Sequence, residues 1–108
     1  MQPSDYCIVS TTTDSKENAD AIAKILLEKK LIACAQKTTT QSSYRWQGKI
    51  IESDEILLQM KTKKSLFEHI KKEVKTLHTY EVPEIIMIPL LDANHFYLEW
   101  IDKETIKV

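Results

Sequence analysis

The order in which hydrophobic patterns follow one another constrains this sequence most. The patterns predict a strand over 6–12, a helix over 16–30, strands over 31–43 and 55–61, a helix over 65–78, a strand over 84–91 and a final helix over 94–102. The order strand–helix–strand–strand–helix–strand is the ferredoxin-like split βαβ pattern. We therefore expect an α+β fold in which two helices cover one face of an antiparallel sheet, followed by a C-terminal helix.

Both long helices are predicted from their starts and from their apolar faces. Asp14 with Glu17, and Ser65 with Glu68, have the spacing of capping boxes. The apolar faces that follow are Ala19, Ile22, Ala23 and Leu26 in the first helix, and Phe67, Ile70, Val74 and Leu77 in the second. The second helix is expected to end near His78.

A long hairpin is expected between the two helices. The Thr- and Ser-rich residues 37–43 continue a strand away from the body, and Gly48 marks the turn. Tyr44 and Trp46 share one face of that strand, where they suit either a binding platform or, as we prefer, a subunit contact. In the returning strand Ile56, Leu58 and Met60 alternate with polar side chains, with Leu57 as the exception.

The strand over 84–91 is apolar on both of its faces. Ile86 and Ile88 alternate with Ile85 and Met87, and a strand of this kind is buried on both sides. Two helices and a short tail cannot cover both faces of a sheet in so small a chain, so a second subunit is expected to cover the rest. Pro89 predicts an edge position or a strand end.

Composition excludes several classes of protein. The chain has 108 residues, which predicts one domain over 1–108 with residues 1–5 as a flexible tail. Its single glycine, Gly48, excludes glycine-rich phosphate loops, and a net charge of -1 argues against a nucleic-acid partner. No apolar run reaches the roughly 18–20 residues of a membrane span, and the N-terminus does not read as a secretory signal.

The two cysteines predict reduced thiols and a cytoplasmic protein. Cys7 and Cys34 lie far apart in apolar runs, as expected of buried thiols rather than of a disulfide. Neither cysteine is next to a plausible base, and Ser10 has no visible catalytic partners. We therefore expect no enzymatic activity.

The strongest local group of candidate metal ligands consists of His78, Glu81 and Glu84. One imidazole and two carboxylates suit Cu(II) or Zn(II), although the spacing matches no established metal-binding motif. Alternatively, His78 simply ends the second helix, where the helix dipole favours an imidazolium. Spacing alone leaves both interpretations open.

Several motifs, in order, resemble the CutA family of divalent-cation tolerance proteins. They are Ile32-Ala33-Cys34-Ala35, Ser43-Tyr44-Arg45-Trp46-Gln47-Gly48-Lys49, residues 55–62, and Tyr97-Leu98-Glu99-Trp100-Ile101. The most specific is His78-Thr79-Tyr80-Glu81-Val82-Pro83-Glu84, which is similar to the family's HPYxxPE signature. The resemblance covers residues 6–101.

The resemblance implies a non-enzymatic cytoplasmic protein, similar to PII signalling proteins, that assembles as a homotrimer through the hairpin and binds or responds to divalent metals such as copper. In the family, copper is placed at a first-strand cysteine and at histidines before the signature tyrosine. Here Ser10 stands at the cysteine position, and His78 is the one histidine kept. Without the thiolate, the resemblance implies at most weak Cu(II) or Zn(II) binding through His78 and a carboxylate, with no obligatory cofactor.

Two other functions remain open at this point. The first is a PII-like regulatory module that binds a small ligand in clefts between subunits. Its candidate residues within the matched motifs are Lys49, Glu55, Lys61, Tyr80, Glu84, Tyr97 and Trp100. The second is a structural trimer that binds another protein, whose identity the sequence does not indicate.

Overall fold

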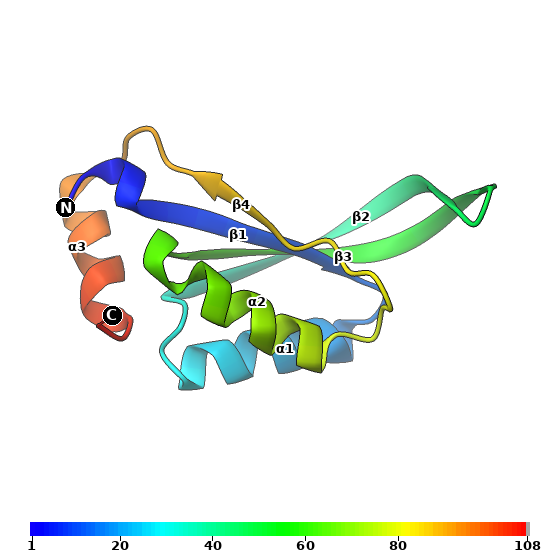
Figure 1. Cartoon of the computed structure of the whole chain (residues 1–108), viewed down its shortest axis with the longest axis horizontal. Coiled ribbons are helices and arrows are strands. Elements are labelled where there is room, and N and C mark those ends of the chain that lie inside the picture. The colour runs from blue at the N-terminus through cyan, green and yellow to red at the C-terminus, as the bar shows by residue number, and fades with distance from the viewer. Residues whose placement is uncertain (108) are drawn as a thin grey trace.

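The computed structural model describes residues 1–107 and contains one sheet and three α-helices (Figure 1). The strands are β1 (Tyr6–Thr13), β2 (Cys34–Trp46), β3 (Lys49–Lys63) and β4 (Ile86–Pro89). The helices are α1 (Lys16–Glu28), α2 (Phe67–Leu77) and α3 (His95–Glu104), and two 3₁₀ helices cover Pro3–Asp5 and Lys64–Leu66. The short 3₁₀ helix at the start occupies the segment that we expected to be a flexible tail.

The sheet is antiparallel throughout and has the strand order β2-β3-β1-β4. This is the predicted ferredoxin-like α+β arrangement. β1 is central, pairing with β3 from Tyr6↔Lys63 to Thr13↔Ile56 and with β4 from Cys7↔Pro89 to Ser10↔Ile86. β4 lies at an edge, as Pro89 predicted, because proline donates no hydrogen bond to a neighbouring strand.

Helices α1 and α2 lie side by side on one face of the sheet (Figure 1). Alternate residues of β1 and β3 point at them, and together they form the main core: Cys7, Val9, Ile22, Ala23, Leu26, Leu31, Ile32, Leu58, Met60, Leu66, Ile70 and Val74. The predicted apolar faces of both helices are therefore confirmed. We call the opposite face of the sheet, which these helices do not cover, the open face.

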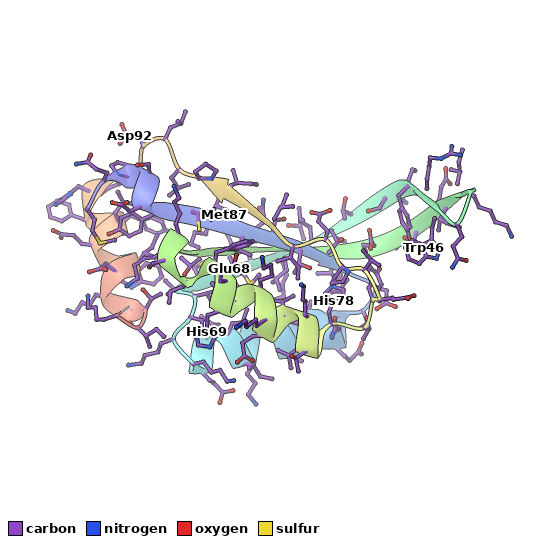
Figure 2. All side chains as sticks on the ribbon, in the orientation of Figure 1. Trp46, Glu68, His69, His78, Met87 and Asp92 are labelled. Atoms are coloured by element: carbon purple, nitrogen blue, oxygen red, sulfur yellow. The ribbon has the colours of Figure 1, made fainter. Side chains whose placement is uncertain are left out.

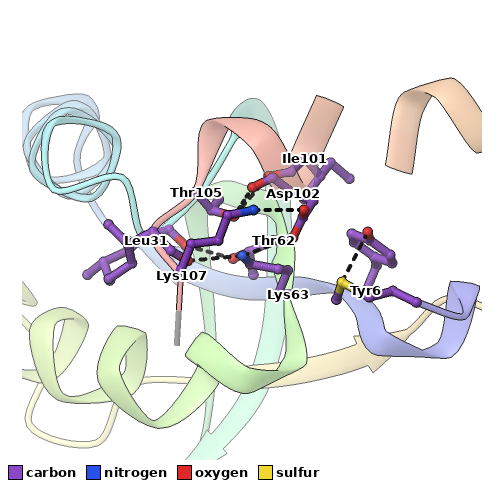
Figure 3. Close-up of polar contacts among 10 residues, drawn as sticks. Tyr6, Leu31, Thr62, Lys63, Ile101, Asp102, Thr105 and Lys107 are labelled. Atoms are coloured by element: carbon purple, nitrogen blue, oxygen red, sulfur yellow. Dashed lines mark hydrogen bonds and ion pairs between the residues drawn. The ribbon is translucent and has the colours of Figure 1, made fainter. Parts of the chain in front are cut away.

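Helix α3 packs at the end of the molecule that also holds both chain termini (Figure 1). Leu98 and Ile101 of α3 form a second, smaller core with Tyr6 of β1. Lys63, only 4% exposed in its side chain, donates to Asp102 Oδ1 at 3.2 Å and to the carbonyl of Ile106 at 2.9 Å (Figure 3). One buried ammonium thus ties the C-terminal segment to β3.

The β2–β3 hairpin projects from the opposite end of the molecule and gives it a length of 44 Å (Figure 1). Its strands stay paired from Cys34↔Lys61 to Trp46↔Lys49. Gln47 and Gly48 form the turn with φ of 50° and 78°, the two positive values of a type I′ turn. The turn expected at Gly48 is confirmed.

The details of the helix ends differ from the prediction. The N-cap of α1 is Ser15, whose hydroxyl accepts from the N–H of Asn18, and not Asp14. Asp14 instead accepts from the Thr79 hydroxyl. Ser65 does not cap α2, because a 3₁₀ turn over Lys64–Leu66 leads into that helix and places Leu66 at its N-cap. The first hairpin strand starts at Cys34 rather than at Leu31, which is buried before it.

The two faces of β4 are not equally buried within the single chain. Met87 packs against the main core, whereas Ile86 and Ile88 lie on the open face and are 46% and 42% exposed. Helices α1 and α2 thus bury the face of β4 that carries Met87, and they leave its other face exposed. Coverage of the open face by a second subunit stays a prediction.

Candidate functional site

A groove of about 780 Å³ lies where the hairpin leaves the body. One side is the hairpin, and the other is the segment over 79–84 that follows α2 and rounds the end of β1 (Figure 1). It is lined by Thr12, Ser42, Ser43, Tyr44, Arg45, Trp46, Glu55, Thr79, Tyr80, Glu81, Val82 and Glu84. Most of the functional candidates of the signature segment therefore face the hairpin.

The base of the groove holds a buried carboxylate. Glu55 is only 5% exposed, and its Oε2 accepts a hydrogen bond of 2.5 Å from the hydroxyl of Tyr80. Burial, and then the hydrogen bond to Glu55, raise the pKa of Tyr80 well above that of a free tyrosine. None of the ion pairs formed within residues 1–107 involves Glu55.

His78 anchors the segment that carries Tyr80. Its Nδ1 accepts from the backbone N–H of Tyr80 at 3.0 Å, so in the neutral ring Nε2 carries the proton. Nε2 then donates to the carbonyl of Thr12 at 2.8 Å. The ring centroids of His78 and Tyr80 also lie 4.9 Å apart. Between these two residues, the hydroxyl of Thr79 donates to the carboxylate of Asp14. His78 therefore joins the end of α2 to the end of β1 (Figure 2).

The structure does not gather the predicted metal ligands around one point. Both ring nitrogens of His78 already have backbone partners, so neither has a lone pair free for a metal. Glu81 and Glu84 line the groove, while Ser10 is buried in β1 opposite Gln59 and Ile86. Within residues 1–107, no three His, Cys, Asp or Glu side chains are placed to hold an ion. These donors do not fit a metal centre in the single chain.

The predicted cleft residues separate into two groups. Glu55, Tyr80 and Glu84 meet in the groove. The others lie elsewhere: Lys49 follows the hairpin turn, Lys61 donates to Gln36, and Tyr97 and Trp100 stack on α3 with ring centroids 5.5 Å apart. These residues are predicted for a cleft between subunits, so whether the two groups meet across a subunit boundary stays a prediction.

Tyr44 and Trp46 of the hairpin line the groove, and both the binding platform and the preferred subunit contact stay predictions. Sequence reasoning missed Thr12, Ser42 and Val82 altogether. The alternation of side chains along a strand could have predicted the hairpin side of the groove. Ser42, Tyr44 and Trp46 lie on the same face as Thr40, and Thr40 pairs with Glu55.

Cys7 provides no reactive nucleophile. Cys7 and Cys34 are both free thiols, and Cys7 is fully buried in the main core. Burial raises the pKa of the Cys7 thiol to about 11, which keeps it protonated at neutral pH. Among the described residues, no helix is both long and apolar enough to cross a membrane.

Comparison with known proteins identifies the family. The family profile described as CutA1 divalent ion tolerance protein matches residues 7–104. The divalent-cation tolerance protein CutA of Thermus thermophilus is 42% identical over 99 residues, covering 91% of this chain and 96% of its own length. The protein of the same name from Pyrococcus horikoshii is 43% identical over 100 residues, covering 93% and 98%.

Solved structures agree with the sequence comparison. CutA1 from Pyrococcus horikoshii superposes with a TM-score of 0.90 at 42% identity, covering 94% of this chain and 99% of that one. CutA1 from Oryza sativa gives a TM-score of 0.92 at 35% identity and covers 95% of both chains. Since the match in sequence and in fold extends over nearly the whole length, this chain belongs to the CutA1 family of divalent ion tolerance proteins.

Proposed function

We propose that this protein serves divalent-cation tolerance as a non-enzymatic, PII-like homotrimer in the cytoplasm. Its working site is the groove between the hairpin and residues 79–84, rather than a metal centre at His78. The main support for this proposal is that the signature residues Tyr80, Glu81 and Glu84 line the groove together with the buried Glu55. A concave groove of this volume, in which side chains from distant segments converge, is the usual form of a small-molecule site.

Weak metal binding is part of the proposal. Glu81 and Glu84 are exposed carboxylates at the rim of the groove, and oxygen ligands alone give Cu(II) or Zn(II) a poor site. His78 would have to release both of its backbone partners before it bound an ion. Metal ions at physiological levels are therefore expected to leave most subunits empty.

The proposed trimer is supported by the apolar side chains that the single chain leaves uncovered. Ile86 and Ile88 of β4 lie on the open face, and Tyr44 and Trp46 lie on the hairpin, all of them exposed. Exposed apolar side chains of this kind favour association with another surface, because their burial is favourable. A neighbouring subunit would cover them and add a further wall to the groove.

Native mass spectrometry tests the assembly and the metal together. The metal-free protein should give a trimer near three times 12.5 kDa, and stoichiometric Cu(II) or Zn(II) should leave it largely unoccupied. A monomer would refute the trimer. One tightly held ion per subunit, lost in His78→Ala but kept in the exposed control His69→Ala, would refute the weak-metal proposal.

A further inference from the structure

The groove has a strong excess of negative charge. Glu55, Glu81 and Glu84 line it, and Arg45 is the one basic residue of its lining. None of these four side chains forms an ion pair within residues 1–107. We propose that the groove binds an organic cation, namely an aliphatic amine with two ammonium groups. This inference rests on the proposed function, since it names the ligand class of the same site.

Glu55 is the strongest indication that the groove suits a cation. A carboxylate that is 5% exposed loses most of its hydration, a loss that is recovered through a nearby opposite charge or several hydrogen bonds. The hydroxyl of Tyr80 supplies one hydrogen bond, to Oε2, whereas a carboxylate has about four acceptor positions. An ammonium from outside the chain would supply the opposite charge.

The aromatic side chains of the groove suit the same ligand. Tyr44 and Trp46 lie on the face of the hairpin that also carries Glu55, and Tyr80 faces them from the other wall. Aromatic faces attract ammonium groups and provide apolar contact for the methylene chain between them. Arg45 alternates with Tyr44 and Trp46 along β2, so its side chain leaves from the other face of the strand.

The three carboxylates differ in exposure, an arrangement that suits a ligand with two positive charges. Glu55 is buried at the base, whereas Glu81 and Glu84 are exposed at the rim. One ammonium at Glu55 and a second at the rim would be joined by a flexible apolar chain. The volume of about 780 Å³ accommodates such a molecule easily.

The test is calorimetric titration of the intact protein with three molecules of the same length: 1,4-diaminobutane, the neutral 1,4-butanediol and the anionic succinate. We expect saturable binding of the diamine alone. Glu55→Gln, which keeps the shape and removes the charge, should weaken diamine binding by about tenfold or more, because a charge-assisted bond is lost. The matched control Glu104→Gln, outside the groove, should bind as the native protein does, and Arg45→Gln should bind at least as tightly.

Parallel native mass spectra of each variant separate this proposal from the trimer. Diamine binding by a monomeric protein would support the cation site and refute the assembly. No saturation with the diamine at millimolar concentrations would overturn the cation site, as would succinate binding that Arg45→Gln abolishes. A trimer that dissociates in Glu55→Gln, with no diamine bound to the native protein, would also overturn it, because the positive charge that pairs with Glu55 would then come from a neighbouring subunit.

Discussion

Thr11 is a polar side chain placed in the core without a partner. Its Oγ1 is fully buried and has no hydrogen-bond partner in the described part of the chain. Thr11→Val keeps the shape and removes the unsatisfied hydroxyl, so it should raise the free energy of unfolding by about 1 kcal/mol. Urea denaturation measures the change.

Thr62 provides the matched control, since it is also fully buried but its hydroxyl donates to the carbonyl of Leu31 at 2.6 Å. Thr62→Val should lower the free energy of unfolding by about 1–2 kcal/mol, because that carbonyl loses its donor. Equal effects of the two substitutions would show that the hydroxyl's partner does not matter.

Tyr80 makes stability depend on alkaline pH. Its pKa is raised in the folded state by burial and by Glu55. Its contribution is therefore complete below the pKa of an unfolded tyrosine, about 10, and is lost as the pH rises through the folded pKa. The free energy of unfolding should fall above pH ~10, and it should fall more gently in Tyr80→Phe. Parallel curves for the native protein and Tyr80→Phe would contradict this.

Individual residues of the site were predicted better than their contacts. Glu55 and Tyr80 both appeared among the candidates, but 25 positions separate them, and only the fold shows that one donates to the other. His78 was expected to be either a metal ligand or a helix end. Its hydrogen bond to Thr12, 66 positions away, is a tertiary contact without a local sequence signal.

At the scale of elements, the hairpin turn carries a correctable strain. Gln47 has φ of 50°, which asparagine tolerates better, and the sequence Asn-Gly is preferred in type I′ turns. Gln47→Asn should raise the free energy of unfolding by a few tenths of a kcal/mol. Gly48→Ala should lower it by about 1 kcal/mol, because φ of 78° is strained for alanine although no atom blocks its Cβ. Thermal melts of both variants check the opposite signs.

Helix α3 is held to β3 by the ion pair between Lys63, which is buried, and Asp102, which is partly exposed. Asp102→Ala should lower the free energy of unfolding by about 2 kcal/mol, because it leaves the Lys63 ammonium buried with only the Ile106 carbonyl. Lys107 also pairs with Asp102, but from the exposed surface, so Lys107→Ala should cost less than ~0.5 kcal/mol. Urea denaturation distinguishes them, and equal losses would refute a special role for Lys63.

The order of elements was predictable, whereas their ends were not. Apolar spacing such as Ile70 and Val74 survives into the structure because it reports which face of a helix is buried. A cap depends on one or two side-chain hydrogen bonds, and several residues compete to form them. Asp14 and Ser15 are both good caps by type, and the structure uses Ser15 while Asp14 binds Thr79.

For the whole molecule, the proposed subunit contact lies on the open face. If the proposed trimer buries Ile88, Ile88→Lys should convert trimer to monomer, because a charge would enter an apolar contact. Leu27 on α1 has the same exposure of 42% but lies in the helix layer, so Leu27→Lys should leave the trimer intact. Sedimentation velocity measures both. A trimer that survives Ile88→Lys would show that β4 is not the contact.

Strand 84–91 shows what a sequence reports about a whole molecule. Its two apolar faces correctly predicted that one chain does not bury all the apolar side chains of this strand. Met87 packs on the core, while Ile86 and Ile88 remain exposed. Composition and spacing do not give the number of subunits, because any partner of suitable shape would cover the same side chains.

The long hairpin also has a consequence for how the chain reaches its fold. Its pairs range from Trp46↔Lys49, three positions apart, to Cys34↔Lys61, so it closes from its own turn outward by contacts that are local in sequence. Hairpins of this kind form within about 1–10 μs, whereas the pairing of Cys7 with Pro89 must close a far larger loop. Folding is therefore expected to begin at the tip that projects farthest from the body and to end when β4 docks on β1 and rounds off the sheet.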